Sequence, residues 1–230
     1  VPSLAQAEIP GILAAFRARH PGVQLRLVDV DSRRSLEMLA RSDIDMAIVS
    51  DAADRKGLAF ERLFWDECHL VVPAGHPLAA RRSVSLRHLD GESLMVSPQG
   101  TTLRQVLDAA FLEAGLTLAP AQQVSTIATL VRMVQTGFGL AIAPAKGLRS
   151  VETDGCVLIS LKEKPGWTVG VARMAGRSES PASLALREFL LARYAQAAAP
   201  ATPRAASAAP PAAALPRSRS ARAPAAPRRR

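Results

Sequence analysis

Hydroxyl side chains stand at three places where a turn leads into a segment with helical spacing, and they are Ser3, Ser97, Thr101, Ser125 and Thr126. A hydroxyl just before a helix accepts hydrogen bonds from the free N–H groups of the first turn. The same N–H groups, at the positive end of the helix dipole, also bind small anions. Capping is the commoner role of one such residue. Three clusters that converge across a cleft would instead form a polar cradle for a carboxylate, sulfate or phosphate-like ligand.

The sequence has few groups for catalysis or metal binding. It contains no G-x-S-x-G nucleophile elbow, no H-E-x-x-H metal pair and no G-x-x-x-x-G-K phosphate loop. Its four histidines have unrelated spacings, and its two cysteines, Cys68 and Cys156, belong to no C-x-x-C pair. We therefore expect no enzyme activity, no cofactor and no metal site. This cysteine usage also fits a reducing compartment.

Helix and strand signals alternate around the hydroxyl clusters. Residues 5–19 have helical spacing, residues 23–27 alternate apolar and polar side chains as a strand does, and residues 44–49 form a short apolar run. Further signals are two strands (58–65 and 69–73), then strand 94–97, helix 103–111, strand 121–124, helix 127–134, strands 140–143, 156–161 and 167–173, and a final helix from Pro181. Such alternation predicts a largely parallel sheet covered by helices. Ligands of these sheets bind outside the carboxyl ends of strands, where the hydroxyl clusters stand, and Ser50-Asp51 would line the same cleft.

Gly137-Phe138-Gly139 separates a predicted helix from the strand that follows it. Gly137 is expected to adopt the left-handed conformation that ends the helix, where a side chain would be costly. Gly139 is expected to let the chain bend at once into the strand. Phe138 has two interpretations, as a plug in the hydrophobic core or as part of the cleft floor, and the core plug is favoured on local sequence.

The last part of the chain differs in composition from the rest. Residues 199–230 are nearly all Ala, Pro, Arg and Ser, which predicts disorder because little apolar surface is available for burial. Subtracting the seven arginines of this tail from the formal charge of +9 leaves +2 for residues 1–198. The tail is interpreted as a solvated terminus, with unspecific attraction to nucleic acid or an anionic surface as the alternative. No apolar run approaches the length of a membrane span.

Five short motifs together resemble the effector-binding domain of LysR-type transcriptional regulators. They are Pro2-Ser3-Leu4, FRARHPGV (16–23), IDMAIV (44–49), VPAGHPLA (72–79) and GFGLAIAP (137–144). They occur in family order, and the resemblance covers about residues 2–197. Each motif is weak alone, but the ordered set is specific.

The resemblance implies an α/β fold of the type 2 periplasmic-binding-protein class, with two α/β lobes that have mixed sheets and are joined by two hinge crossings. One lobe would comprise residues 1–74 plus 172–198, the other residues 75–171, and residues 199–230 would be the disordered tail. The family's first strand, an apolar run just before Pro2-Ser3, would be truncated, which exposes the edges of neighbouring strands. We expect such a chain to be less stable than one that includes the strand.

The resemblance also implies a function. The chain would be the ligand-sensing domain of a cytoplasmic DNA-binding regulator, with a small, anionic effector bound between the lobes and not transformed. It would form homodimers or tetramers, would not engage membranes, and would contact DNA only through an N-terminal region missing here. By position, the effector contacts would be Ser3, Ser97, Thr101, Ser125, Thr126 and Phe138.

Two alternative functions share this fold. A transport-type solute-binding protein is the first, and the residues upstream of Val1 would separate it from a regulator by a signal peptide or a DNA-binding segment. An enzyme such as a dehydratase is the second, but it needs an acid–base set, and the hydroxyls have no partnered base in the sequence. No Arg or Lys has a clear cleft position to hold a carboxylate with two hydrogen bonds, since Arg104 is expected to be solvated.

Overall fold

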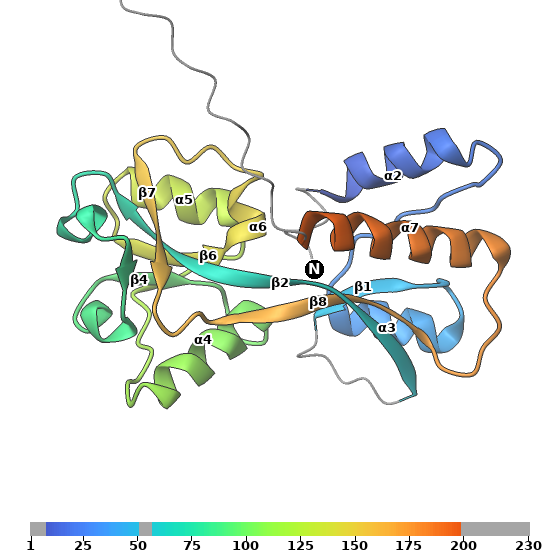
Figure 1. Ribbon diagram of the computed structural model, residues 1–230. Helices are drawn as coiled ribbons and strands as arrows, with labels where there is room; N and C mark the ends of the chain where they lie inside the picture. Colours follow the sequence, from blue (N-terminus) through green and yellow to red (C-terminus); the bar gives the residue numbers. More distant parts are fainter. Residues whose placement is uncertain (1–7, 51–56, 199–230) are drawn as a thin grey trace, which may run out of the picture. The chain divides into compact units, whose positions relative to one another are not determined.

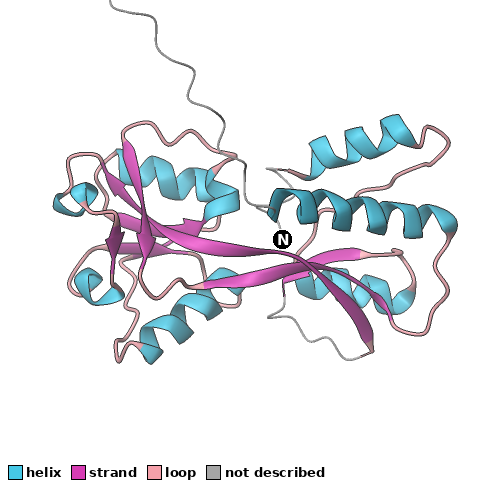
Figure 2. Ribbon diagram, viewed as in Figure 1, coloured by secondary structure: helices cyan, strands magenta, loops and turns pink. Residues whose placement is uncertain are grey.

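A computed structural model describes residues 8–50 and 57–198 (Figure 1). Its helices and strands, distinguished in Figure 2, are α2 (Ile9–Arg19), α3 (Ser32–Arg41), β1 (Ala47–Ser50), β2 (Leu58–Pro73), η1 (Pro77–Ala80), β3 (Ser83–Val84), η2 (Leu86–Leu89), β4 (Leu94–Val96), α4 (Thr102–Glu113), β5 (Gln122–Gln123), α5 (Ile127–Gln135), β6 (Leu140–Pro144), α6 (Ala145–Leu148), β7 (Cys156–Leu161), β8 (Gly166–Met174) and α7 (Pro181–Ala198). Ser3, Asp51 and the tail at 199–230 lie outside the described residues. No helix in the described part of the chain is long and apolar enough to cross a membrane.

Two long antiparallel strands, β2 and β8, connect two groups of elements (Figure 1). We call the group of α2, α3, β1 and α7 lobe I, and the elements from η1 to β7 lobe II. The strands pair from Leu58 opposite Met174 to Glu67 opposite Gly166, and β2 then continues into lobe II between β6 and β7. The predicted two-lobed α/β fold with two crossings is confirmed.

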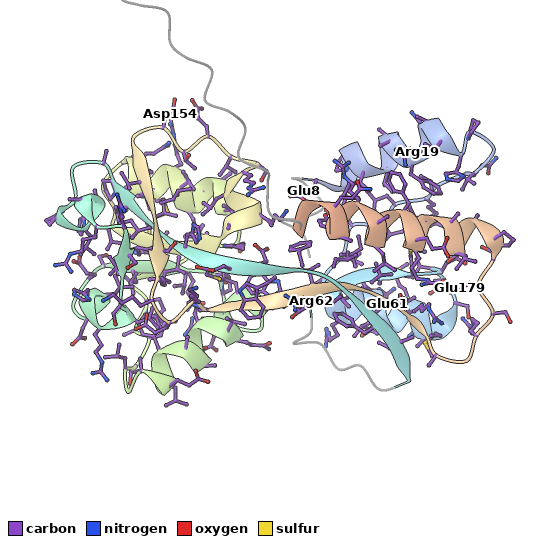
Figure 3. All side chains as sticks on the ribbon, in the orientation of Figure 1. Glu8, Arg19, Glu61, Arg62, Asp154 and Glu179 are labelled. Carbon is purple, nitrogen blue, oxygen red and sulfur yellow. The ribbon has the colours of Figure 1, made fainter. Side chains whose placement is uncertain are left out.

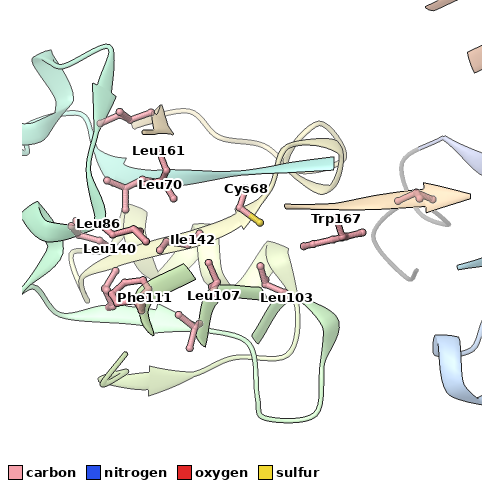
Figure 4. Close-up of a cluster of buried hydrophobic side chains, with 14 of the residues drawn as sticks. Cys68, Leu70, Leu86, Leu103, Leu107, Phe111, Leu140, Ile142, Leu161 and Trp167 are labelled. Carbon is pink, nitrogen blue, oxygen red and sulfur yellow. The ribbon is translucent and has the colours of Figure 1, made fainter. Parts of the chain in front are cut away.

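The largely parallel sheet expected from the alternation of elements is wrong for lobe II, whose sheet is mixed, as the family resemblance implies. Strand β4 is parallel to β5 and β6, whereas β2 is antiparallel to β6 and β7. Every residue of β4 and β6 is buried, because helices cover both faces of this sheet. Helix α4 packs Leu103, Leu107 and Phe111 on one face (Figure 4), and α5 belongs to a second buried cluster with Val71 of β2. Complete burial of one such leucine contributes about 2 kcal/mol.

In lobe I the described strands β1, β8 and β2 form an antiparallel sheet. Helix α3 buries Leu39 against Ala47, Val49 and Ala172. Asp31 caps this helix, because its side chain accepts a hydrogen bond from the Arg34 N–H. Helices α2 and α7 supply Ile12, Phe16, Leu190 and Tyr194 to the remaining core of the lobe.

The predicted strand at residues 23–27 is wrong for the described chain, since these residues form no ladder. Their alternating side chains suit a strand, but Leu27 is 55% exposed and the only described partner of β1 is β8. A cavity of about 330 Å³ has residues 23–30 on part of its wall and residues 43–48 of the β1 segment on another. A strand needs a neighbour with free backbone groups, and the alternation of side chains does not supply one. The truncation of the first strand itself stays a prediction.

The two strands predicted at 58–65 and 69–73 are also wrong as separate elements, since they form the single strand β2. The residues Asp66 and Glu67 fall in the gap between the two predicted strands. They lie where β2 passes from one lobe to the other, and both continue the ladder with β8. Asp66 is buried at that crossing, where a hydrogen bond from the next lobe satisfies one of its oxygens.

Candidate functional site

The hydroxyl clusters of lobe II lie at the carboxyl ends of two neighbouring parallel strands. Ser97 directly follows β4, and Ser125 follows β5 by one residue. The Val124 N–H donates to the Val96 carbonyl oxygen at 2.9 Å, which keeps the two chain segments side by side beyond the last ladder pair. Ser97 and Ser125 therefore stand at the same edge of the sheet, as predicted from their positions after strands.

The first of these clusters caps helix α4. The Thr101 hydroxyl accepts a hydrogen bond from the Arg104 N–H at 3.2 Å and donates to the Pro98 carbonyl oxygen at 2.9 Å. It also lies 2.9 Å from the hydroxyl of Ser97, which is buried. Because the hydrogen of Thr101 is used on Pro98, Ser97 is the donor in this pair. To bind an anion at this place, the Ser97 hydroxyl would have to rotate and donate its hydrogen to the anion instead of to Thr101.

The second cluster caps helix α5. The Thr126 hydroxyl accepts from the Thr129 N–H at 3.2 Å and donates to the Thr129 hydroxyl at 2.8 Å. The predicted capping role of Thr126 is therefore confirmed. Ser125 and Thr126 are both exposed, so their polar atoms are open to solvent at the end of the helix that carries the positive dipole.

A hydrogen bond between the two lobes shows which edge of the lobe II sheet faces lobe I. Ser50, the last residue of β1, has its hydroxyl 3.3 Å from that of Thr102, the first residue of α4. Ser50 is only 1% exposed. The carboxyl end of a lobe I strand thus meets the carboxyl edge of the lobe II sheet. This arrangement brings Ser50, Ser97, Thr101 and Thr102 to one region between the lobes, which we call the hydroxyl cleft after the cleft that the sequence predicts.

Phe138 lies elsewhere, and both interpretations of it are wrong. It is 61% exposed, so it is no core plug. It follows the C-terminal end of α5, and β6 begins two residues later with Leu140 opposite Leu94, the first residue of β4. Phe138 therefore stands at the amino-terminal edge of the lobe II sheet, whereas the hydroxyl cleft lies at the carboxyl edge.

The geometry of the helix end explains this position. The Phe138 N–H donates to the Met133 carbonyl oxygen and the Gly137 N–H to that of Val134, which is the Schellman arrangement. Gly137 has the predicted left-handed φ of 84°. Gly139 has a φ of 143°, and a Cβ atom there would lie 2.2 Å from the Ser93 carbonyl oxygen. Both glycine roles are confirmed, and the aromatic side chain between them is turned outward.

Arg104 also differs from expectation, since it is 6% exposed rather than solvated. Its Nε donates to Asp108 Oδ1 at 2.8 Å, one turn further along α4 from the capped end. Its Nη1 has no hydrogen-bond partner among the described residues. The prediction of a solvated Arg104 is therefore wrong, and its side chain is held in an ion pair with Asp108.

Asp66 is a buried acid at the junction that sequence reasoning missed. Its Oδ1 accepts a hydrogen bond from the Lys146 N–H at 3.1 Å, and its Oδ2 has no partner in the described part of the chain. Burial raises the pKa of Asp66 to about 6, although the hydrogen bond and the charge of Lys146 oppose the rise. The only signal in the sequence was an acid between two apolar segments, and Asp66 was overlooked because it fell in the gap between the two predicted strands.

The described residues contain no group of three or more His, Cys, Asp or Glu side chains that could hold a metal ion. Cys68 and Cys156 are both free thiols. The polar atoms available at the hydroxyl cleft are therefore hydroxyls and helix N–H groups, which suit recognition of an anion by hydrogen bonds.

Comparison with known proteins gives a family match over residues 1–195, described as the LysR substrate binding domain. The RuBisCO operon transcriptional regulator of Allochromatium vinosum is 29% identical over 192 residues, which cover 81% of this chain and 63% of the regulator. The transcriptional regulator CbbR of Xanthobacter flavus is 33% identical over 200 residues, covering 83% and 58%. The chain thus spans about three fifths of the length of these relatives.

Solved structures show the same fold. The BenM effector-binding domain with benzoate superposes with a TM-score of 0.76 at 20% identity, covering 86% of this chain and 90% of that one. The effector-binding domain of QuiR in complex with shikimate gives a TM-score of 0.74 at 21% identity, covering 84% and 93%. At these identities the likeness concerns the fold.

Proposed function

Because the chain belongs to the LysR substrate-binding domain family, we propose that it is the ligand-sensing domain of a LysR-type DNA-binding transcriptional regulator. Its relatives in A. vinosum and X. flavus are transcriptional regulators. Since the chain spans only part of their length, DNA binding is assigned to an N-terminal region outside this sequence. The proposed compartment is the cytoplasm, where the DNA is, and the proposed assembly is a homodimer or tetramer.

The proposed ligand site is the hydroxyl cleft, and the Ser50–Thr102 contact is the observation that carries this proposal. It supports a site with hydroxyls on both lobes, to which Ser97, Thr101, Ser125 and Thr126 contribute from lobe II. Two capped helix ends, of α4 and α5, add N–H groups and positive dipole ends. Ser3 remains the proposed contact from the undescribed N-terminal residues, and Phe138 is not proposed again.

A small anion is the ligand class that these groups favour. Benzoate and shikimate, the ligands bound to two proteins of this fold, are carboxylates under neutral conditions. A carboxylate would accept hydrogen bonds from hydroxyls of both lobes, and such charge-assisted bonds are stronger than those between neutral groups. The ligand would act by binding one arrangement of the lobes better than another, since equal affinity for both shifts nothing.

We propose binding without chemical change of the ligand. An activated nucleophile needs a base within hydrogen-bond reach. The Ser97 hydroxyl is paired instead with Thr101, and Ser50 with Thr102. A solute-binding protein of a transport system is the alternative with this fold, and the relatives' function in transcription favours the regulator. The residues upstream of Val1 would separate the two, because they would encode a DNA-binding segment in one case and a signal peptide in the other.

Calorimetric titration with benzoate, shikimate and sulfate tests the site. For a ligand that binds, Ser97→Ala and Ser125→Ala should each weaken affinity about 10-fold, as one hydrogen bond to a charged group contributes about 1.5 kcal/mol. Ser83→Ala is the matched control, because Ser83 is exposed on β3. Equal affinity of the wild type and both cleft variants would show that the ligand binds elsewhere.

A further inference from the structure

A cluster of charged and aromatic side chains joins the lobes at a second place. Lys146 of α6 donates from its Nζ to Glu8 Oε1 at 2.6 Å, and the Tyr194 hydroxyl of α7 donates to Glu8 Oε2 at 2.8 Å. Glu8 precedes α2, at the end of lobe I that faces lobe II (Figure 3). The ion pair therefore bridges the lobes between residues that are 138 positions apart in the chain. We call Glu8, Lys146 and Tyr194 the junction cluster.

The surroundings of the junction cluster strengthen its ion pair. The Lys146 Nζ lies 4.8 Å from the ring centroid of Phe64 and 5.6 Å from that of Tyr194. The Lys146 and Glu8 side chains are only 20% and 23% exposed. Burial alone would raise the pKa of Glu8, but the hydrogen bonds from Lys146 and Tyr194 outweigh it and lower that pKa. This cation lies between a carboxylate and two aromatic rings and is partly shielded from water. Its interaction energy therefore depends strongly on the distances to these groups.

Helix α6, which carries Lys146, and helix α4, which carries Thr102, lie on opposite faces of the lobe II sheet. Leu148 of α6 packs in the same cluster as Val71, whereas Leu107 of α4 packs in the same cluster as Leu70. Successive side chains of a strand point to opposite faces, so α6 and α4 cover opposite faces, as Figure 1 shows. The lobes are thus bridged on one face by Glu8–Lys146 and on the other by Ser50–Thr102. A rotation about the two crossing strands that separates the lobes on one face brings them closer together on the other.

The crossing strand has a local irregularity beside the cluster. The register of β2 against β8 shifts between Arg62 and Phe64, and such a bulge bends a strand and interrupts its pairing. The Asp66 side chain meanwhile accepts from the Lys146 N–H. The backbone of α6 is therefore fixed to the crossing strand, and the Lys146 side chain reaches from there to lobe I.

We propose that the junction cluster is a latch that holds the two lobes in the arrangement seen here and whose release lets them rotate about β2 and β8. Among the described residues, no hydrogen bond or ion pair joins the latch to Ser50, Ser97, Thr101 or Thr102, so the latch can be tested without a ligand.

The distance between spin labels on the latch face tests this directly. Labels at Ala14→Cys in α2 and Ala128→Cys in α5 occupy exposed positions on different lobes, in a Cys156→Ser background, while Cys68 is fully buried. Dilution with unlabelled protein removes distances between chains. Pulsed electron–electron double resonance should give one narrow distribution of label-to-label distances for the latched chain. Lys146→Met should add a population at longer distance, because it keeps the aliphatic part of the side chain and removes the charge.

Two substitutions serve as controls. Lys146→Arg keeps the cation and should retain the narrow distribution, and Lys162→Met makes the same change at an exposed lysine of lobe II and should have no effect. Circular dichroism verifies that each variant is folded. If Lys146→Met does not fold, Glu8→Gln and Tyr194→Phe, which keep the shape of their side chains, should each broaden the distribution. A folded Lys146→Met chain with the wild-type distribution would overturn the proposal, as would unchanged distributions in both milder variants.

Discussion

At the scale of single residues, the buried acid Asp66 links stability to pH. Its pKa rises from 3.8 to about 6 on folding, mainly through burial, while Lys146 and Arg149 lower it and Glu8 raises it. A folded state with the higher pKa binds the proton more tightly than the unfolded chain does. Stability from this group is therefore fully present below pH 3.8 and is lost as the pH rises through about 6.

The variant Asp66→Asn should lack this dependence on pH. It keeps an oxygen for the Lys146 N–H and cannot ionise. Relative to the wild type, its free energy of unfolding should increase by roughly 2 kcal/mol between pH 4 and pH 7, which follows from the two pKa values. Urea unfolding of both proteins across this range measures the difference. Parallel pH profiles would show that Asp66 takes up no proton on folding.

Gly137 and Gly139 differ in what a side chain would meet. Both have positive φ, but open space surrounds a Cβ at Gly137, whereas one at Gly139 would collide with the Ser93 carbonyl oxygen. Gly137→Ala should therefore cost about 1–2 kcal/mol from the left-handed backbone alone. Gly139→Ala should cost clearly more, because the backbone of β4 or β6 must shift. Denaturant midpoints of the two variants compare these costs, and equal midpoints would contradict the role of the Ser93 contact.

At the scale of elements, the start of α5 depends on the Thr126 cap. Thr126→Ala should lower the free energy of unfolding by about 1 kcal/mol, since the Thr129 N–H loses its acceptor. Thr126→Ser keeps the hydroxyl and is the control, expected within a few tenths of a kcal/mol of the wild type. Chemical denaturation measures both. A Thr126→Ala chain as stable as the serine variant would mean that water replaces the cap without cost.

Elements also show where local patterns mislead. Helices α4 and α5 begin next to the hydroxyl residues that predicted them, because a cap and its N–H partner lie within a few residues. The strand predicted at 23–27 failed because pairing depends on a distant part of the chain. The break predicted in β2 failed because the partners of Asp66 come from β8 and α6.

At the scale of the whole molecule, one hydrophobic cluster runs through both lobes. It includes Ile12 and Tyr194 from lobe I and Leu107 and Phe111 from lobe II, with Trp167 where β8 leaves lobe II (Figure 4). A continuous core couples the stability of its parts, even though the lobes are proposed to rotate.

We therefore expect the described part of the chain to unfold in one transition. Leu107→Ala should cost about 2–5 kcal/mol, as for other leucines removed from a core, and should shift the whole transition. Tryptophan fluorescence reports on the crossing strands, and far-ultraviolet circular dichroism on all helices, so the two should coincide. Two separate transitions, with only one moved by Leu107→Ala, would show lobes that unfold independently.

The amino-acid sequence alone determined the order of most helices and strands, the caps of α4 and α5 and the glycines that end α5. Each of these depends on hydrophobic periodicity or on hydrogen bonds between residues close in the chain, whereas the two-lobed class of fold was implied by the family resemblance. The tertiary structure alone decided that Phe138 faces solvent at the edge opposite the hydroxyl cleft, that Arg104 is buried and that Ser50 meets Thr102. It also decided that Glu8, Asp66, Lys146 and Tyr194 meet at one junction. These outcomes depend on which distant segments pack together, and the energy of such packing is not encoded in the spacing of neighbouring residues.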